Sequence, residues 1–403
     1  MLIKNLHLKN IGPFIESKID FSNKINSDNS NVTIITGENG TGKSIILDSI
    51  RTLLMGIYET VERDICSSNN FLIDMNLTID AVDVNIHSKS KKDRNGFNIN
   101  NHEINNLFHN HLKTKYKRNF IFDYWTTKLS NDKFNLSNIE ALKTNDHLDS
   151  TLSGIHKNID VTRTIAFFDY LKDSKNKSEK ELGGFLYKLV EKIINNSLSN
   201  GELSHVSRID LTALVNVQGK DISLDKLSSG NLYLITRMIS LIRQIYAICT
   251  NFNIPIKEYK SIQGVLLIDE AENHLHPKWQ KKFLANILEI FPNIQIILTT
   301  HSPFIVSSIK DSRIYVCKSF DSYSEIIEET DFYTNSPIEE ILRSPLFNTN
   351  SFNSDITNLI ELRKKHIENN ENEKADIIEK KLLKINPEYF SYLTINKVLK
   401  NLK

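Results

Sequence analysis

The eight residues Gly-Glu-Asn-Gly-Thr-Gly-Lys-Ser at positions 37–44 constrain the fold of this chain more than any other feature. They match the GxxxxGK[ST] pattern of a phosphate-binding loop at every defined position. The loop follows the apolar run Val32–Ile35 and leads into Ser44–Tyr58, whose apolar residues recur at helical spacing. A strand, a glycine-rich loop and a helix in this order predict an α/β fold that binds a nucleotide through its phosphates.

The chemistry of the loop assigns a role to each of its residue types. Glycines at 40 and 42 let the backbone turn so that its N–H groups converge on phosphate oxygens, at the positive end of the following helix. Lys43 is expected to reach the β- and γ-phosphates, and the Ser44 hydroxyl to ligate Mg²⁺. The predicted nucleotide-binding residues are Asn39, Gly40, Thr41, Gly42, Lys43, Ser44 and Ile45.

A second apolar run, Val265–Ile268, ends in the carboxylates Asp269 and Glu270. Such a run is typical of a buried strand, and ligands bind outside the carboxyl ends of strands in open α/β sheets. We therefore expect Asp269 to hold hydrated Mg²⁺ and Glu270 to polarise a water for attack on the γ-phosphorus. The alternative is that Asp-Glu simply begins a solvated loop.

Two further segments could contact the γ-phosphate because of their positions in the sequence. Ser229 and Gly230 begin a long apolar-periodic helix, where free N–H groups could receive a γ-phosphate, although a Ser-Ser-Gly turn is also an ordinary helix N-cap. His301 ends the strand Ile294–Thr299 and could contact the same phosphate, or be a loop histidine with a structural partner. His274 and His276, with His301, leave a zinc site as a minor alternative to a loop at a subunit contact.

The remaining pattern predicts further elements. Strands are expected at Leu2–Leu8, Ile15–Phe21 and Leu211–Val217, and a period-two stretch from Ile73 to Ile86 changes phase at Asp80–Ala81, which predicts a turn or bulge there. Residues 88–106 are predicted to form a loop, and 107–200 a mixed to helical region. The expected helices are Ile155–Leu171, Leu182–Leu198, Leu232–Ile248, Pro277–Ile290, Asp355–Lys384 and Pro387–Lys400.

Composition limits the classes of partner. The 403 residues carry 50 basic and 49 acidic side chains, a net charge of +1 that excludes a wholesale polyanion-binding surface. Cys66, Cys249 and Cys317 lie far apart, which argues against a disulfide framework and favours a reducing compartment. With no apolar run approaching 18 residues, we expect a cytoplasmic protein with no membrane partner.

The motifs together resemble a known family. GENGTGKS (37–44), LSSGN (227–231), LLIDEAENHLHP (266–277) and LTTHSP (298–303), in that order, look like the ABC-type ATPases of the SMC, RecF and OLD group. The opening Leu8–Phe14 is similar to that group's N-terminal signature. The pattern DExExHLHP resembles that of standalone AAA-type ATPases found in bacterial antiphage systems, such as Septu and retron-associated ATPases. The motifs cover about 1–60 and 205–320.

The resemblance implies an architecture. The fold class is an α/β P-loop ABC-ATPase head, a mixed sheet with flanking helices, that carries a largely helical insertion and a helical C-terminal tail. Residues 1–65 form the N-terminal lobe with the phosphate loop, and 66–204 a hairpin plus the insertion. Residues 205–335 form the C-terminal lobe with the signature, acidic strand and switch histidine, and 336–403 the tail.

The resemblance also implies a mechanism. Two heads sandwich two ATP molecules in a homodimer, or in a higher oligomer built from it, each ATP contacted by Lys43 and Ser44 of one subunit and Ser229 and Gly230 of the other. Glu270, His301 and Lys43 are the expected catalytic residues, Ser44 and Asp269 the metal ligands, and ATP and Mg²⁺ the cofactors. The family's glutamine between loop and signature has no counterpart from Ser44 to Gln218. Either another polar residue replaces it, or hydrolysis is slow and ATP acts mainly as a dimerisation ligand.

Two functions fit these expectations. The first is an ATPase that dimerises on ATP and regulates a separate effector, a nuclease, in antiphage defence; no metal-nuclease pattern is evident in the chain. The second is a RecF-like DNA-repair ATPase that clamps DNA. DNA would meet the basic stretches Lys89–Arg94 and Lys113–Arg118, the latter followed by Tyr124 and Trp125, unless both are solvated faces. In the tail, an apolar stripe interrupted at Glu368–Lys374 fits an antiparallel helical pair, which either packs on the head or docks a partner.

Overall fold

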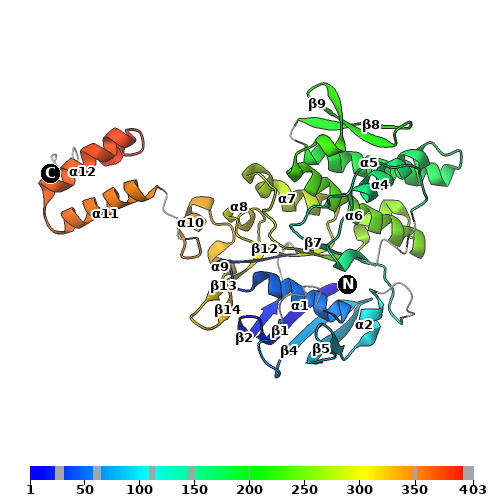
Figure 1. Cartoon of the computed structure of the whole chain (residues 1–403), viewed down its shortest axis with the longest axis horizontal. Helices are drawn as coiled ribbons and strands as arrows, with labels where there is room; N and C mark the ends of the chain where they lie inside the picture. Colours follow the sequence, from blue (N-terminus) through cyan, green and yellow to red (C-terminus); the bar gives the residue numbers. More distant parts are fainter. Residues whose placement is uncertain are drawn as a thin grey trace. The chain divides into compact units, whose positions relative to one another are not determined.

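The computed structural model of the chain describes residues 1–22, 31–57, 65–108, 114–142, 144, 150–198, 200–347 and 352–393. The chain divides into two compact units, Met1–Ile338 and Glu339–Lys403. The first unit contains every motif named above (Figure 1).

A six-stranded sheet forms the centre of the first unit, in the order β14-β13-β3-β12-β11-β7. All neighbours are parallel except β14, which is antiparallel to β13. Every residue of β3, β7, β11 and β12 is buried, as expected of parallel strands covered on both faces. The strands are β3 (Val32–Gly37), β7 (Ile121–Trp125), β11 (Gly264–Ile268), β12 (Ile294–Thr300), β13 (Arg313–Ser319) and β14 (Ser324–Glu328).

A five-stranded antiparallel sheet, in the order β2-β1-β4-β5-β6, faces the other side of helix α1 (Lys43–Met55), so that α1 lies between the two sheets (Figure 1). Buried side chains of both sheets and α1 form one apolar cluster, which fixes the helix that follows the phosphate loop. The strands are β1 (Leu2–Ile11), β2 (Phe14–Asp20), β4 (Leu72–Ile79), β5 (Val82–Lys91) and β6 (Phe97–Ile99).

The phase change expected at Asp80–Ala81 is confirmed as a two-residue hairpin turn. Ile79 pairs with Val82, and Asp80 and Ala81 have φ of 51° and 62°, which matches the twist that a tight hairpin requires. The loop predicted at 88–106 is wrong: β5 continues to Lys91, and β6 and the short helix α2 (His102–Asn106) follow. Its side chains are mostly polar because these elements lie at the edge of the sheet.

Three helices, α4 (Asn158–Lys172), α5 (Lys177–Ser197) and α6 (Ser229–Phe252), lie together with a three-stranded sheet beside them (Figure 1). Helices α4 and α5 belong to the predicted insertion, and α6 to the predicted C-terminal lobe. Among the described helices, α6 alone has the length and apolar composition of a membrane span, but 78% of its most apolar window is buried, as in a core helix. The other elements here are β8 (Gly201–Ser207), β9 (Thr212–Val217), β10 (Lys220–Ser223), and the 3₁₀ helices η1 (Ser150–Leu152), η2 (Leu224–Lys226) and η3 (Ile256–Ser261).

Strand β7 is absent from the sequence prediction, which assigned 107–200 as mixed to helical. The run Ile-Phe-Asp-Tyr-Trp has strong strand formers, but Asp123 at its centre interrupts the apolar pattern. Its carboxylate is fully buried, and the side chains of His156 and Ser240 lie within hydrogen-bond distance of it.

Short helices complete the first unit: α7 (Pro277–Ile290), α8 (Pro303–Val306), α9 (Thr330–Tyr333) and the start of α10 (Ile338–Arg343). The second unit contains an antiparallel helical pair, α11 (Ser354–Glu368) and α12 (Asn372–Ile385). The predicted segment Asp355–Lys384 is thus two helices with a break at Asn370, where φ is 59°, and the helical pair expected from its interruption at Glu368–Lys374 is confirmed. Of the helix expected at Pro387–Lys400, residues 391–393 are helical and 394–400 lie outside the described residues.

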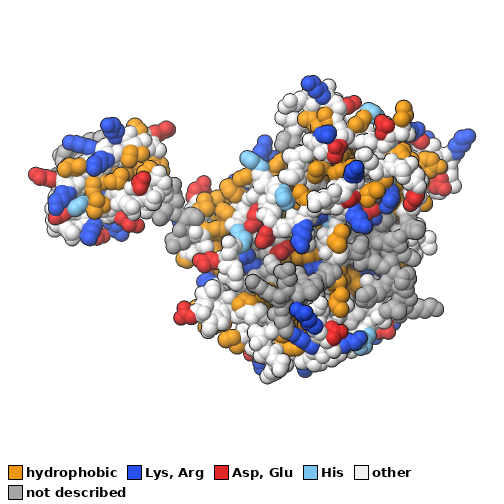
Figure 2. Space-filling model, in the orientation of Figure 1, with side chains coloured by type: hydrophobic (Ala, Val, Ile, Leu, Met, Phe, Trp, Pro, Cys, Tyr) orange, Lys and Arg blue, Asp and Glu red, His pale blue; other side chains and the backbone are white. Residues whose placement is uncertain are grey.

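The helical pair has a small core of its own, made of Ile378, Leu382, Phe390 and Leu393, and an ion pair of 2.7 Å between Arg363 and Glu379. Figure 2 shows further hydrophobic side chains on the surface of this unit. The predicted fold class, an α/β head with a mixed sheet, a largely helical insertion and a helical C-terminal segment, is confirmed.

Candidate functional site

The phosphate loop has a backbone that favours glycine at three positions. Gly37, Gly40 and Gly42 have φ of 148°, 79° and 95°, in the region that side chains rarely adopt. Gly42 is the N-cap of α1, which places the helix N-terminus directly behind the loop. A Cβ atom at Gly42 would lie 2.7 Å from atoms of Pro13 and Phe14, so the β1–β2 turn packs against the loop and holds its shape.

Alanine substitutions at two of these glycines are expected to separate the cost of backbone strain from the cost of a steric clash. Gly40→Ala meets no atom within 4 Å, so its cost is the backbone strain alone, about 1–2 kcal/mol. Gly42→Ala adds the displacement of Pro13 and Phe14, and we expect a further loss of about 1–3 kcal/mol in the free energy of unfolding. Urea denaturation of the two variants measures the difference. Equal losses would show that the β1–β2 turn does not support the loop.

Lys43 is folded back onto the loop. Its Nζ donates hydrogen bonds to the carbonyl oxygens of Gly37 and Glu38, at 3.0 and 2.7 Å. Burial lowers the pKa of Lys43, while the carboxylates of Glu272, Asp269 and Glu270 oppose that effect. The ammonium therefore lies over the loop among acceptors that a phosphate can replace.

Two residues from distant parts of the sequence meet at the carboxyl edge of the central sheet. The Ser44 Oγ donates to Asp269 Oδ1 at 2.9 Å, and the Thr299 Oγ1 donates to the same oxygen at 2.6 Å. Burial raises the pKa of Asp269, and the two hydroxyl donors and Lys43 counteract the rise. A hydroxyl and a carboxylate at this distance are oxygen donors of the kind that Mg²⁺ prefers, so the residues fit this cation.

Glu270 follows in a strained conformation, with φ of 48°. Its backbone N–H donates to Thr299 Oγ1 at 2.8 Å, and its Oε2 accepts from Asn273 Nδ2 at 2.6 Å. The carboxylate is only partly buried. The neighbouring strand β12 thus fixes the backbone of Glu270, and Asn273 orients its side chain.

His301 lies at the end of β12, near Lys43. Its backbone N–H donates to Glu272 Oε1 at 2.7 Å, and Thr300 Oγ1 donates to the other oxygen of Glu272 at 2.6 Å. Burial, and then the charge of Lys43, lower the pKa of His301, which favours a neutral imidazole at neutral pH. A neutral ring can donate one hydrogen bond to an incoming anion.

Ser229 and Gly230 lie apart from this cluster. They begin α6, with Ser228 as N-cap, and a Cβ atom at Gly230 would lie 2.3 Å from the carbonyl oxygen of His274. A cavity of about 400 Å³ lies at this helix start, and none of its described lining residues belongs to the phosphate loop. The cavity is lined by Ser228, Gly230, Asn231, Leu234, His274, Leu275, His276, Lys278 and Trp279.

A second cavity, of about 580 Å³, opens beside Ser44 and Asp269. Its other walls come from α1, from residues 126–130 after β7, and from residues 153–156 before α4. Within the described residues, one chain therefore brings together Lys43, Ser44, Asp269 and Glu270, while Gly230 lines the other cavity.

Several residues of the site were missed by the sequence prediction. Thr299, Glu272 and Asn273 contact the expected residues directly, and all three lie inside the motifs. The hydroxyl and amide side chains next to the predicted metal ligands were the available signal, but only the fold shows which of them contact the site.

The alternative of a zinc site is not supported. His274 Nε2 lies 2.9 Å from the carbonyl oxygen of Thr127, and His276 Nδ1 accepts from the Lys278 N–H at 3.3 Å as the N-cap of α7. In the part of the chain that the structure describes, no group of three His, Cys, Asp or Glu side chains is placed to hold a metal ion.

Within the basic stretch Lys113–Arg118, Arg118 is not placed to meet DNA, whereas Lys115 and Lys117 are exposed. Arg118 is buried, donates to the Phe120 carbonyl and packs on the rings of Phe108 and Phe120, because it lies just before the buried strand β7. Tyr124 and Trp125 are also buried and cannot stack on bases. Lys113 lies outside the described residues.

Comparison with known proteins identifies the family. The family model described as "AAA domain, putative AbiEii toxin, Type IV TA system" matches residues 32–307, more than half of the chain. The chain belongs to this family. The match contains the phosphate loop, the signature, the acidic strand and the switch histidine, so the predicted recognition of an AAA-type ATPase is confirmed.

Two curated relatives share most of their length with this member of the family. The retron Vc95 probable ATPase of Vibrio cholerae is 25% identical over 81% of this chain and 76% of its own length. The Septu protein PtuA of Bacillus thuringiensis is 26% identical over 86% and 87%, respectively. A solved SMC head, bound to the C-winged helix domain of ScpA, is 16% identical with a TM-score of 0.48, and covers 81% of this chain and 97% of that chain.

Proposed function

We propose that this protein is an ABC-type ATPase that binds and hydrolyses ATP, dimerises head to head on ATP, and regulates a separate effector, a nuclease, in bacterial antiphage defence. The observation that carries the proposal is the meeting of Ser44 and Asp269 at the carboxyl edge of the sheet, beside Lys43 and Glu270. These are the groups that phosphoryl transfer to water requires.

ATP is bound by the loop, with the N–H groups of residues 39–45 on its phosphates and Lys43 exchanging the Gly37 and Glu38 carbonyls for the β- and γ-phosphates. Ser44 and Asp269 hold Mg²⁺, which neutralises charge on the phosphates when bound. Glu270, held by Thr299 and Asn273, accepts the proton of the attacking water. His301 donates a hydrogen bond to the γ-phosphate.

The separation of two cavities supports a homodimer. Ser229 and Gly230 begin a helix whose N–H groups can bind a γ-phosphate, but Gly230 lines a different cavity from Ser44 and Asp269 of its own chain. A second subunit, turned head to head, would supply its signature to the first subunit's ATP and receive the same in return. This closed twofold arrangement satisfies both sites at once.

Replacing an exposed signature residue tests the dimer. Ser229→Glu is expected to weaken the ATP-dependent dimer about 100-fold or more, because two like charges meet at each site, while ATP binding to the monomer stays unchanged. A carboxylate at a helix N-terminus favours folding, so the head remains intact. Light scattering with and without MgATP measures the dimer, with Ser229→Ala as the matched control. A Ser229→Glu variant that dimerises like the wild type would contradict the arrangement.

The defence role rests on the sequence motifs and on the similarity to a retron ATPase and a Septu protein. Cys66, Cys249 and Cys317 lie far apart in the sequence, which favours action in the reducing cytoplasm. Phage plating on cells that carry the complete operon tests the role: protection is expected with the wild type and lost with Glu270→Gln. Unchanged protection would contradict it.

A further inference from the structure

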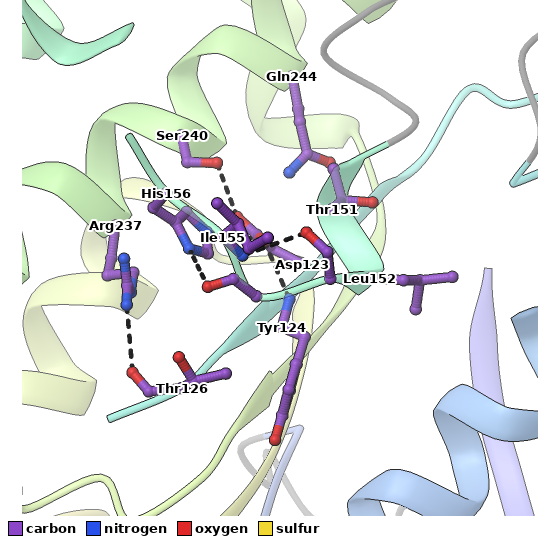
Figure 3. Close-up of polar contacts among 12 residues, drawn as sticks. Asp123, Tyr124, Thr126, Thr151, Leu152, Ile155, His156, Arg237, Ser240 and Gln244 are labelled. Carbon is purple, nitrogen blue, oxygen red and sulfur yellow. Dashed lines mark hydrogen bonds and ion pairs between the residues drawn. The ribbon is translucent and has the colours of Figure 1, made fainter. Parts of the chain in front are cut away.

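A buried polar cluster joins strand β7 to helix α6 and has no part in the ATP chemistry described above. At its centre is Asp123, in the middle of β7, which is fully buried. Figure 3 shows His156, from the segment before α4, and Ser240, from α6, converging on its carboxylate. Burying a carboxylate is unfavourable unless it is paired and hydrogen-bonded, so these contacts are needed for the strand to exist.

Hydrogen bonds from three elements meet at the carboxylate of Asp123. Its Oδ1 accepts from the Tyr124 N–H at 3.0 Å, and its Oδ2 accepts from Ser240 Oγ at 2.9 Å. His156 Nδ1 lies 3.1 Å from the Gly154 carbonyl oxygen, and Nε2 lies 3.0 Å from Asp123 Oδ1. Both ring nitrogens of His156 therefore face oxygen atoms, and the ring bridges β7 and the segment before α4.

The face of α6 toward β7 is polar, unlike most of this apolar helix. Arg237, Ser240 and Gln244 are spaced at i, i+3 and i+7 and therefore share one face. Gln244 Oε1 accepts from the Phe122 N–H at 3.0 Å, on the outer edge of β7, which is the last strand of its sheet. Arg237 Nη2 donates to the carbonyl oxygens of residues 126 and 128, at 3.2 and 2.7 Å.

The elements joined by this cluster end at the two parts of the proposed shared site, which are the metal edge with Ser44 and Asp269, and the start of α6 with Ser229 and Gly230. At the end of β7, the Trp125 carbonyl accepts from the Asp269 N–H at 2.9 Å, beside the proposed metal ligand. At its N-terminus, α6 carries Ser229 and Gly230. His156 also lines the 580 Å³ cavity that opens at Ser44 and Asp269. One set of side chains thus connects the metal edge, the cavity wall and the signature helix.

We propose that Asp123, His156 and Ser240 are positioning residues that fix the signature helix α6 relative to the metal edge. ATP bound at the metal edge then sets the orientation of the start of α6. The proposal rests on the proposed function, because it assigns to α6 the signature that a partner's ATP meets. The contact between Asp123 and His156 holds β7 to the segment before α4, and the hydrogen bond from Ser240 links β7 to α6. Breaking either contact lets the signature move independently of the bound nucleotide.

The test compares Asp123→Asn, His156→Gln and Ser240→Ala with the wild type and with the exposed control Asp173→Asn. We expect the affinity of the monomer for MgATP, measured in the Ser229→Glu background, to stay within about twofold, because Lys43 and Ser44 are untouched. The kcat at saturating ATP is expected to fall at least tenfold for Asp123→Asn and His156→Gln, and severalfold for Ser240→Ala. The kcat of the double variant of Asp123 and His156 is expected to fall no further than that of either single variant.

Trp125 provides a readout that a purely structural role would not move. The chain has two tryptophans, Trp125 and Trp279, and both are kept, because Trp279 lines the cavity at the start of α6. The tryptophan emission is expected to change on MgATP binding, and the accompanying dimerisation to weaken severalfold when Ser240→Ala is introduced, with little change in Tm. Ser240→Ala keeps the contact between Asp123 and His156, so it serves where Asp123→Asn does not fold.

The outcomes separate this proposal from the function itself. If the wild type neither dimerises on ATP nor hydrolyses it, the proposed function fails. The positioning role is overturned if the wild type does both and the three variants match its kcat. It is also overturned if the variants have a lower Tm but an unchanged kcat for the folded fraction.

Discussion

Glu270→Gln is expected to lower the kcat for ATP hydrolysis about 10²- to 10⁴-fold, the usual contribution of a general base. The amide keeps the size of the side chain and its contact with Asn273, but it cannot accept a proton from the attacking water. Because Lys43, Ser44 and Asp269 are unchanged, MgATP binding is retained, and the ATP-bound dimer accumulates. Single-turnover hydrolysis and light scattering in the same samples measure both effects.

The matched control for this variant is Glu289→Gln, which makes the same substitution on the exposed side of α7. Its kcat is expected to equal that of the wild type. If Glu270→Gln hydrolyses ATP at the wild-type rate, another group activates the water and the assignment of Glu270 is wrong.

Lys43→Met is expected to weaken MgATP binding about 10- to 150-fold, because charge-assisted hydrogen bonds to the phosphates contribute about 1.5–3 kcal/mol. Dimerisation on ATP is lost with it. Methionine fills nearly the same volume without a buried charge, and burial already disfavours the ammonium, as the lowered pKa of Lys43 indicates. The Tm without nucleotide is therefore expected to stay within about 2–4 °C of the wild type.

Isothermal titration with MgATP and thermal denaturation measure the two properties of Lys43→Met separately. Lys188→Met, on the exposed side of α5, is the control. Unchanged affinity with an unchanged Tm would show that Lys43 keeps its contacts with the Gly37 and Glu38 carbonyls when nucleotide binds.

The parts of the site that follow from local sequence were predictable. The loop at 37–44 and the run Val265–Ile268 are each a strand joined to a turn of defined chemistry, so residue type and order are enough to place them. Their meeting, which brings Ser44 to Asp269 over 225 positions, follows from the rule that parallel strands end at one edge.

The contacts that depend on tertiary packing were not predictable. Strand β7 has a carboxylate at its centre, which a period-based reading excludes from a core, and the partners that satisfy it come from residues 156 and 240. Thr299 and Asn273 have no pattern of their own; the strand order decides that they orient Asp269 and Glu270. The buried Arg118 shows the opposite error, since a basic residue in a charged stretch packs on two aromatic rings.

The shared active site is the central claim, and mixing two inactive variants tests it most directly. Lys43→Met has an intact signature, and Ser229→Glu has an intact phosphate loop, so a mixed dimer contains one complete site. Neither variant alone is expected to hydrolyse ATP, and an equimolar mixture is expected to regain ATPase activity that rises with the square of protein concentration at low concentration. A mixture that stays inactive while both variants bind each other, or Ser229→Glu that is fully active alone as a monomer, would contradict the account.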